Sequence, residues 1–243
     1  MGRDSGLVAT RKMVAMAMIS AIAFLLAAFV RFPVVPAVGF LRYDPKDVII
    51  VIGGYLFGPL AALIVTVVVA MLEMFTVSGT GFVGFIMNVV SGVAFACTAS
   101  AIYSRWRTRQ GAIIGLIAAT LAMTAVMMLW NYFLTPIFLD QPREQVARLL
   151  VPGFMPFNLF SGTLNSAIIL LIYKPISRAI SFSGLMATSQ PESRRLGAII
   201  PIAAALIAIS GIMWILVQQG LFDPRVEYYE EVSYEIRRFC TMG

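Results

Sequence analysis

Long apolar stretches, separated by short polar or glycine-rich segments, dominate the hydrophobic pattern of this chain. The stretches cover residues 13–30, 48–57, 60–77, 82–103, 112–138, 157–173 and 197–217. A helix needs about 20 apolar residues to cross the hydrocarbon layer of a bilayer. Most of the stretches come close to that length or exceed it. The pattern therefore predicts an all-α, polytopic membrane helical bundle.

The second and third stretches predict a helical hairpin. The second stretch is short and ends at Gly58-Pro59. Because proline disfavours helical geometry for the residue before it, we expect a very tight turn at this point. One long kinked helix over residues 47–77 is the alternative. With the hairpin counted as two helices, the seven stretches give seven crossings.

The composition agrees with a chain that faces lipid. Of the 243 residues, 60% are hydrophobic and 12% are charged, whereas roughly a quarter of a soluble domain is charged. The net charge of +6 does not indicate nucleic-acid binding, because the chain has no dense basic run. Lys and Arg also collect in the cytoplasmic loops of membrane proteins, which explains a positive charge of this kind.

The distribution of Lys and Arg favours a multi-pass protein with a cytoplasmic N-terminus. In the seven-crossing topology, the cytoplasmic segments contain Arg3, Arg11, Lys12, Arg105, Arg107, Arg109, Lys174, Arg178, Arg194 and Arg195. Only Asp4 and Glu192 accompany them, in keeping with the positive-inside rule. The loops 31–46, 77–82 and 139–156 then lie outside.

Four segments follow from this topology. Residues 1–180 form a six-helix membrane domain, and residues 181–196, rich in Ser, Arg, Pro and Glu, form a cytoplasmic linker. Residues 197–218 form an additional, seventh transmembrane helix. Residues 219–243 form a short external tail, in which acidic, basic and aromatic residues alternate.

A glycine-rich turn joins two helices on the outer side. Its residues are Gly79, Thr80, Gly81 and Phe82. Glycines expose backbone N–H and C=O groups next to a helix N-terminus, where a ligand can bond to them. A plain tight turn is the alternative. A phosphate-binding loop is excluded, because no GKS or GKT sequence follows the glycines.

Polar side chains inside the apolar stretches are candidates for a ligand site, because such groups usually face the bundle interior or a cavity. The candidates are Asn88, Asn131, Tyr132, Asn158, Ser161 and Asn165. The last three follow an i, i+3, i+7 pattern, which places them on one face of a helix. Amides donate and accept hydrogen bonds, so they suit a neutral, planar ligand with many acceptors. Hydrogen bonding between helices without a ligand is the alternative.

Three acidic residues lie near the outer surface. Glu73 interrupts an apolar stretch, and we expect it to pair with a Lys or Arg. Asp44 fits the N-cap of the second helix with Pro45 at its first position, and Asp47 fits its first turn. Both aspartates can contact a ligand as well, so both roles stay open.

The first helix carries small residues four positions apart, Ala17 and Ala21. This spacing clears a flat strip on which another helix can approach closely. We refer to the two residues as the alanine strip. The strip serves either to dock a partner protein or to pack within the chain.

Residues for familiar catalytic machinery are missing. The sequence contains no histidine, which excludes a Ser-His-Asp triad and a histidine-based zinc site. It contains no Walker sequence, so the chain does not hydrolyse ATP itself. We therefore expect no catalytic residue, no metal site and no cofactor.

Taken together, these motifs resemble the substrate-binding S component of energy-coupling factor (ECF) vitamin transporters, and within that family the riboflavin-specific branch. The resemblance covers about residues 10–178. Its carriers are the alanine strip, Asp47-Val48, Phe57-Gly58-Pro59, Gly79-Thr80-Gly81-Phe82-Val83-Gly84, Asn88, Asn131-Tyr132-Phe133 and Phe157-Asn158-Leu159.

The resemblance implies a six-helix S-component core with a vitamin pocket that opens outward, in the lipid of a prokaryotic cell membrane. Riboflavin would be the transported ligand. Its ring would meet Asn131, Asn158 and the backbone of residues 79–82, and its ribityl chain would lie under the 31–47 loop. The alanine strip would dock on the transmembrane T subunit, and two ABC ATPase subunits would supply energy. Transport would occur by toppling of the whole S component.

Two positions depart from the riboflavin branch. Ser161 stands where that branch often has Lys, and Phe85 stands where it often has Glu. An S component for another vitamin or flavin-like molecule is therefore one alternative. A stand-alone secondary carrier is another, although it would need intramembrane charges, which are sparse. A membrane enzyme lacks its catalytic groups here, and an assembly protein would use the alanine strip alone.

Overall fold

Helices make up almost all of the computed structural model, which describes residues 2–35, 41–140, 142–182 and 199–219. Within this part of the chain, six helical spans are long and apolar enough to cross a membrane. They are Ala9–Phe29, Pro59–Thr76, Gly81–Arg105, Arg109–Phe138, Arg143–Ile172 and Ile200–Gln218. The predicted polytopic bundle of membrane helices is confirmed.

The elements follow one another along the chain with short connections. The helices are α1 (Gly2–Phe29), α2 (Lys46–Phe57), α3 (Pro59–Thr76), α4 (Gly81–Gly92), α5 (Thr98–Arg105), α6 (Arg109–Leu139), α7 (Arg143–Leu149), α8 (Met155–Phe182) and α9 (Ile199–Gln218). Two π-helical turns, η1 (Val93–Cys97) and η2 (Leu150–Phe154), join α4 to α5 and α7 to α8. Two short antiparallel strands, β1 (Phe32–Pro33) and β2 (Arg42–Tyr43), form what we call the strand pair.

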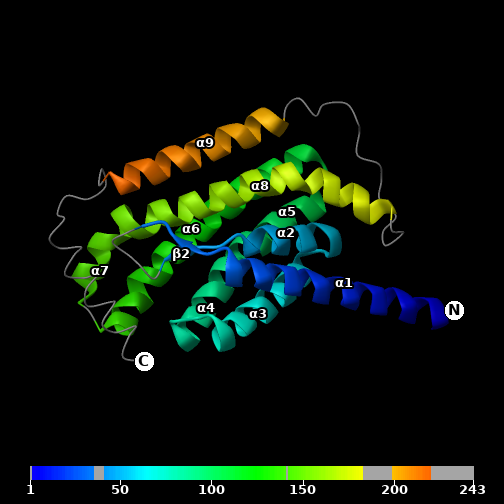
Figure 1. Ribbon diagram of the computed structural model, residues 1–243, viewed down its shortest axis with the longest axis horizontal. Coiled ribbons are helices and arrows are strands. Elements are labelled where there is room, and N and C mark those ends of the chain that lie inside the picture. Colours follow the sequence, from blue (N-terminus) through cyan, green and yellow to red (C-terminus); the bar gives the residue numbers. More distant parts are fainter. Residues whose placement is uncertain (1, 36–40, 141, 183–198, 220–243) are drawn as a thin grey trace.

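The break between α2 and α3 lies where the sequence predicts it. Gly58 has a φ of 94°, which is accessible to glycine and strained for other residues. The two helices pack closely, since a Cβ on Gly54 would come within 2.9 Å of the Cβ of Ala62. The hairpin prediction is confirmed. With 12 residues, α2 is only about 18 Å long, shorter than the roughly 30 Å of hydrocarbon, so it is not among the six long spans. It still carries the chain back along the bundle between α1 and α3 (Figure 1), as the seven-crossing topology requires.

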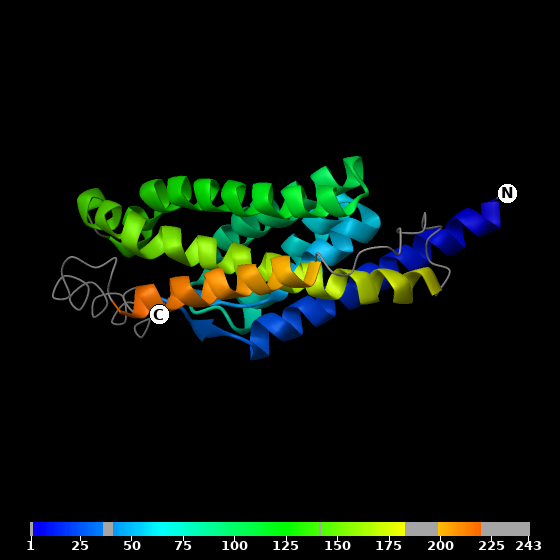
Figure 2. The same cartoon turned by 90° about the horizontal axis from the view of Figure 1, so that it is seen from above.

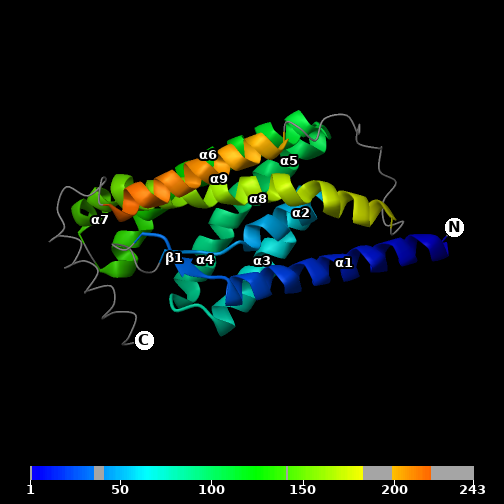
Figure 3. The ribbon, with the colours of Figure 1, turned by 45° about the horizontal axis from the view of Figure 1, so that its top comes forward.

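The long helices lie side by side (Figure 1), with α1 along one edge of the bundle and α9 along the opposite edge, against α8. Figure 3 shows the same arrangement from a tilted direction. In Figure 2 the N-terminal end of α1 projects beyond the other helices at one end of the molecule. The strand pair and α7 lie towards the other end, so the loops that follow α1 and α6 meet there.

Two apolar clusters fill the interior. The central cluster packs α2, α3, α6 and α8 around η1, with Ile50, Phe95 and Ile169 fully buried. A second cluster lies beside the strand pair. This strand-side cluster consists of Val34, Val35, Leu41, Tyr43, Val146, Leu149, Phe154 and Phe160. Burial of such side chains is the main favourable term that holds the strand pair against the helices.

The alanine residues of α1 fall on two different faces. Ala23 and Ala27 are fully buried and pack α1 against the bundle. Ala17 and Ala21 lie on the exposed face, next to Met18, which is 60% exposed. Because other alanines supply the internal packing, the alanine strip is left available at the surface of the bundle.

The segments after the core are only partly described. Helix α8 continues to Phe182, two residues into the predicted linker. The rest of that linker and the tail from residue 220 lie outside the described residues. The seventh predicted transmembrane helix, residues 197–218, corresponds to α9, which begins at Ile199. The domain boundaries otherwise stay predictions.

Candidate ligand-binding cavity

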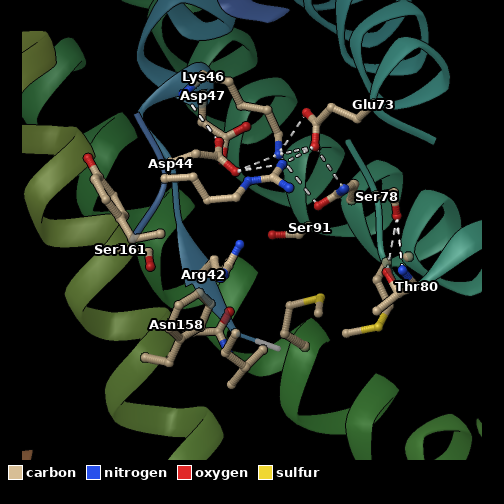
Figure 4. Close-up of a pocket in the computed structure, with 18 of the residues that line it drawn as sticks. Arg42, Asp44, Lys46, Asp47, Glu73, Ser78, Thr80, Ser91, Asn158 and Ser161 are labelled. Carbon is tan, nitrogen blue, oxygen red and sulfur yellow. Dashed lines mark hydrogen bonds and ion pairs between the residues drawn. The ribbon is translucent and has the colours of Figure 1, made fainter. Parts of the chain in front are cut away.

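A cavity of about 600 Å³ lies between the strand pair and helices α2, α3, α4, α6 and α8. Small-molecule sites usually occupy about 300–1,000 Å³. Polar side chains line the cavity on two sides (Figure 4), with Asp44, Lys46 and Glu73 on one and Asn158 on the other. We call Arg31, Asp44, Lys46, Asp47, Glu73 and Asn88 the charged wall, and Asn131, Asn158, Ser161 and Asn165 the amide wall.

Glu73 is the centre of the charged wall. It is 0% exposed and lies 2.9 Å from the Nη2 atom of Arg31 and 3.1 Å from the Nζ atom of Lys46. The amide nitrogen of Asn88 donates to the same carboxylate at 3.2 Å. A buried carboxylate needs such partners because it has lost its hydration. The expectation that Glu73 pairs with a Lys or Arg is confirmed, and it pairs with one of each.

Asp44 contacts Lys46 rather than capping the helix at the predicted position. Helix α2 begins at Lys46 with Pro45 as its N-cap, so the predicted N-cap at Asp44 is wrong by one residue. The Asp44 carboxylate accepts from the backbone N–H of Lys46 at 3.4 Å and lies 3.1 Å from its Nζ atom. Attraction to the two cations of the wall explains this placement, since Arg31 lies 3.8 Å away.

Asp47 occupies the first turn of α2, as predicted. Its Oδ1 atom is buried and makes no hydrogen bond within the described part of the chain. Helix α4 approaches it closely at Gly92, where an added Cβ would lie 3.5 Å from Oδ1 and 2.7 Å from the methyl group of Thr66. A buried polar atom without a partner is uncommon in native interiors, and this one belongs to a residue that lines the cavity.

The amide wall is held by short hydrogen bonds within its own helices. The Asn131 Nδ2 atom donates to the Met127 carbonyl at 2.7 Å, and Asn158 Nδ2 donates to the Phe154 carbonyl at the same distance. The Oδ1 atom of Asn131 accepts from the Thr135 hydroxyl at 2.8 Å. These bonds fix each amide in one orientation, and no bond of the protein to Asn158 Oδ1 is present among the described residues.

Tyr43 links the strand pair to the amide wall. Its hydroxyl donates to Asn165 Oδ1 at 2.8 Å, and its ring meets Phe160 edge-on at 5.7 Å. Burial, together with the charges of Asp44 and Asp47, raises the pKa of Tyr43 above that of an ordinary phenol. The hydroxyl therefore stays protonated and keeps its donor role at physiological pH.

An apolar, flexible part of the lining lies beside the amide wall. Met123 and Met127 lie eight and four residues before Asn131, on the same face of α6. Phe157 lines the cavity next to Asn158. Thioether side chains adapt to a flat aromatic surface and contact it favourably. The Ser161 hydroxyl lies among these groups, and its Oγ atom is buried without a hydrogen-bond partner in the described residues.

Most of the predicted substrate-binding residues line this cavity, and three do not. Those that line it are Asp44, Asp47, Gly79, Thr80, Asn88, Asn131, Asn158, Ser161 and Asn165. Phe82 is 65% exposed and Tyr132 is 40% exposed. Tyr132 follows Asn131 in a helix, so it points about 100° away from the face that bears Asn131. Gly81, with a φ of 54°, starts α4 beside the cavity without lining it.

Sequence reasoning did not place several lining residues. Arg31, Arg42 and Lys46 come from the 31–46 segment, which the sequence predicts to be an outer loop without assigning a role to its cations. Arg31 and Lys46 bond to Glu73, 42 and 27 residues away. The nearest available signal was the predicted need of Glu73 for a cation. Nothing in the local pattern of Met123 and Met127 separates them from other core residues of a membrane helix.

Comparison with known proteins agrees with this geometry. The model of the family "ECF transporter, substrate-specific component" matches residues 11–173. The chain is 33% identical to the riboflavin transporter RibU of Staphylococcus aureus (strain TCH60), over 69% of this chain and 90% of that protein. It is 28% identical to the riboflavin transporter FmnP of Bacillus subtilis (strain 168), over 67% of this chain and 90% of that protein.

A solved structure is also similar. The structure described as "Structure and mechanism of the S component of a bacterial ECF transporter" superposes with a TM-score of 0.61 and 33% sequence identity. The superposition covers 70% of this chain and 98% of that one. These relatives are transport components rather than enzymes. The chain belongs to the family of substrate-specific components of ECF transporters.

Proposed function

We propose that this chain is the S component of an ECF importer and captures riboflavin from outside the cell. The similarity to riboflavin transporters supports this ligand. The observation that carries the proposal is one cavity of about 600 Å³ with amides on one side and a charged cluster on the other. Three of its lining residues carry an enclosed polar atom without a partner in the described part of the chain, namely Arg31 Nε, Asp47 Oδ1 and Ser161 Oγ. A turn of these side chains towards the cavity would give the atoms a partner on a polar ligand, which supports a ligand in this space.

The two walls suit the two parts of riboflavin. Its ring system is flat, with several acceptors along a polar edge, and amides with thioethers and an aromatic ring favour such a surface. We assign the ring to Asn131, Asn158 and their apolar neighbours. The ribityl chain carries hydroxyl groups, which can donate to Asp47 and accept from Arg31. This assignment supports a pose with the ribityl chain near the 31–47 segment.

The energy for uptake would come from other subunits. We propose that the alanine strip docks on a transmembrane T subunit and that two ABC ATPase subunits drive the cycle. The exposure of Ala17 and Ala21 on α1 supports this role. The N-terminus would be cytoplasmic in a prokaryotic cell membrane, since the cations of the 105–109 and 1–12 segments then share that side.

Titration of the purified protein with riboflavin tests the ligand. We expect stoichiometric quenching of flavin fluorescence in detergent, with no competition from an excess of an unrelated vitamin such as thiamine. Another flavin that displaces riboflavin with higher affinity would point to a different natural ligand. Well-folded protein that quenches no flavin would overturn the proposal.

Docking is tested separately by replacing alanine with a large side chain. We expect Ala17→Trp and Ala21→Trp to abolish co-purification with the T subunit while riboflavin binding stays intact, because both residues lie far along α1 from the cavity lining. Normal co-purification of both variants would remove the alanine strip from the interface. The exposed neighbour Met18, changed to Ala, serves as the control.

A further inference from the structure

Helix α9 lies outside the part of the chain that the family shares. The family match ends at residue 173, whereas α9 covers Ile199–Gln218. Sequence reasoning gave it no role beyond an additional membrane crossing. The structure shows it packed along α8, on the side of the bundle away from α1 (Figure 1).

One narrow face of α9 makes this contact. Ala203, Leu206, Ser210, Met213 and Val217 repeat at alternating spacings of three and four residues, which places them on one stripe of a helix. Ala203 is 0% exposed and Ser210 is 1% exposed. The Ser210 hydroxyl lies 2.7 Å from the hydroxyl of Thr163 on α8. The other faces are exposed, as a helix in lipid requires. We call these five residues the α9 seam.

The two halves of the seam contact different parts of the protein. Leu206, with its neighbour Ile202, packs against the central cluster. Met213 and Val217 pack against the strand-side cluster. The first half therefore packs on the central cluster, which reaches the cavity through Met123 and Met127 of α6. The second half packs on the strand-side cluster, which reaches it through Leu41 and Tyr43.

The strand-side cluster forms the back of the cavity wall. Leu41 and Tyr43 belong to this cluster and also line the cavity. Tyr43 bonds to Asn165 of the amide wall and packs on Phe160. A side chain that packs on the outer side of this cluster therefore supports both the strand pair and the amide wall.

Helix α8 is held from both sides. On the α6 side, an added Cβ at Gly162 would lie 2.6 Å from the methyl group of Thr120, so the two helices are in close contact. On the α9 side, Thr163 bonds to Ser210. Asn158, Ser161 and Asn165 line the cavity from the same helix, so the rotation of α8 sets where their polar atoms point.

We propose that α9 is a positioning element of the binding site. Met213 and Val217 hold the strand pair and α8 in place behind the cavity, and this support lengthens the lifetime of the bound ligand. The ligand part of this inference rests on the proposed function, whereas the support of the strand pair does not. Neither residue touches the ligand, since neither lines the cavity.

Two matched double variants of the full chain test the inference. Met213→Ala with Val217→Ala truncates the second half of the seam. Ile202→Ala with Leu206→Ala truncates, at the same four-residue spacing, the side chains of α9 that pack on the central cluster. Hydrogen exchange of backbone amides in residues 41–47 is measured without ligand. We expect faster exchange in the 213/217 variant alone, while both variants lose thermal stability.

Riboflavin release is then measured by stopped-flow fluorescence. We expect the 213/217 variant to release the ligand about tenfold faster, which corresponds to about 1.4 kcal/mol, with a smaller change in the association rate. The 202/206 variant should release it at the wild-type rate.

Equal acceleration in both variants would show a general loss of stability and overturn the inference. Unchanged exchange at residues 41–47 in the 213/217 variant would also overturn it. If wild-type protein binds no riboflavin, the proposed function fails, and the exchange experiment still decides whether α9 supports the strand pair.

Discussion

The two walls of the cavity are built in opposite ways. The charged wall depends on contacts between elements far apart in the chain, such as Arg31 to Glu73, 42 residues apart, and Lys46 to Glu73, 27 residues apart. In the amide wall, Asn131 and Asn158 bond within single helices, four residues apart, and Asn165 alone accepts a bond from the distant Tyr43. The charged wall ties α2, α3, α4 and the segment after α1 together, whereas the bonds of Asn131 and Asn158 only fix the direction of their side chains.

This difference predicts which wall mainly affects stability and which mainly affects ligand binding. A change in the charged wall breaks ion pairs between elements, so it should act mainly on stability. A change in the amide wall leaves the helices intact, so it should act mainly on ligand binding. Asp47 belongs to the charged wall and Ser161 to the amide wall. Each has a buried polar atom without a hydrogen-bond partner in the described residues, so its substitution tests binding with little loss of protein contacts.

The largest effect is expected for Glu73→Gln. The substitution keeps the shape of the side chain but removes the charge that balances Arg31 and Lys46. Because it breaks the contacts of a buried carboxylate with both cations, while Asp44 stays as their partner, we expect the free energy of unfolding to fall by about 1.5–3 kcal/mol. Thermal unfolding in detergent measures this, with the exposed Glu144→Gln on α7 as control. Wild-type stability of Glu73→Gln would show that the charged wall does not hold the fold.

Asn158→Ala should act on binding instead. We expect riboflavin affinity to fall by about 2 kcal/mol, because a buried partner of the ring edge is lost, while thermal stability changes little. Asn131→Ala should weaken binding less, since both ends of that amide already bond within α6. Fluorescence titration of the two variants checks the order. A loss of stability without a loss of affinity in Asn158→Ala would reverse the roles given to the two walls.

Within the charged wall, Asp47→Asn should weaken ligand binding without lowering the stability of the unliganded protein. The Oδ1 atom has no hydrogen-bond partner in the described residues, so removal of the charge should leave the stability of the unliganded protein equal or higher. Binding should weaken by about 1.5 kcal/mol, because hydrogen bonds to a charged acceptor are stronger than those to a neutral one. Titration and thermal unfolding of the same preparation test this. Unchanged affinity would remove Asp47 from the ribityl site.

Ser161→Ala should give the smallest effect. Its hydroxyl has no partner among the described residues, so stability should stay within about 0.5 kcal/mol. A single neutral hydrogen bond to the ligand is worth about 0.5–1.5 kcal/mol, and we expect a loss at the lower end of that range. Ser166→Ala, on the same helix and outside the cavity lining, is the control. Equal affinity of the Ser161 variant and wild type would leave this hydroxyl without a ligand.

Much of the fold is predictable from the sequence, because it depends on local signals. The apolar stretches fix the spans by length, and Gly58-Pro59 fixes the break between α2 and α3 through backbone geometry. The spacing of Asn158, Ser161 and Asn165 predicts one face of α8, and all three line the cavity. In each case, the residues that decide the structure are neighbours in the sequence.

The features that the sequence does not predict depend on contacts between distant segments. Asn131 and Tyr132 are adjacent in a polar motif, and only the packing of α6 decides that one lines the cavity and the other faces outward. Glu73 bonds to Arg31 and Lys46. Both lie at the ends of the 31–46 segment, in which no hydrophobic periodicity indicates the structure. The role of Met213 and Val217 depends on which helix α9 packs against, and that choice leaves no mark in the sequence of α9 itself.

A structure of the protein with riboflavin bound would show whether the ligand lies between the two walls. We expect ligand density there, with the ring edge within hydrogen-bond distance of Asn158 and a ribityl hydroxyl within that distance of Asp47 Oδ1. Density outside the cavity, or inside it without contact to either wall, would show that the two walls do not form the riboflavin site.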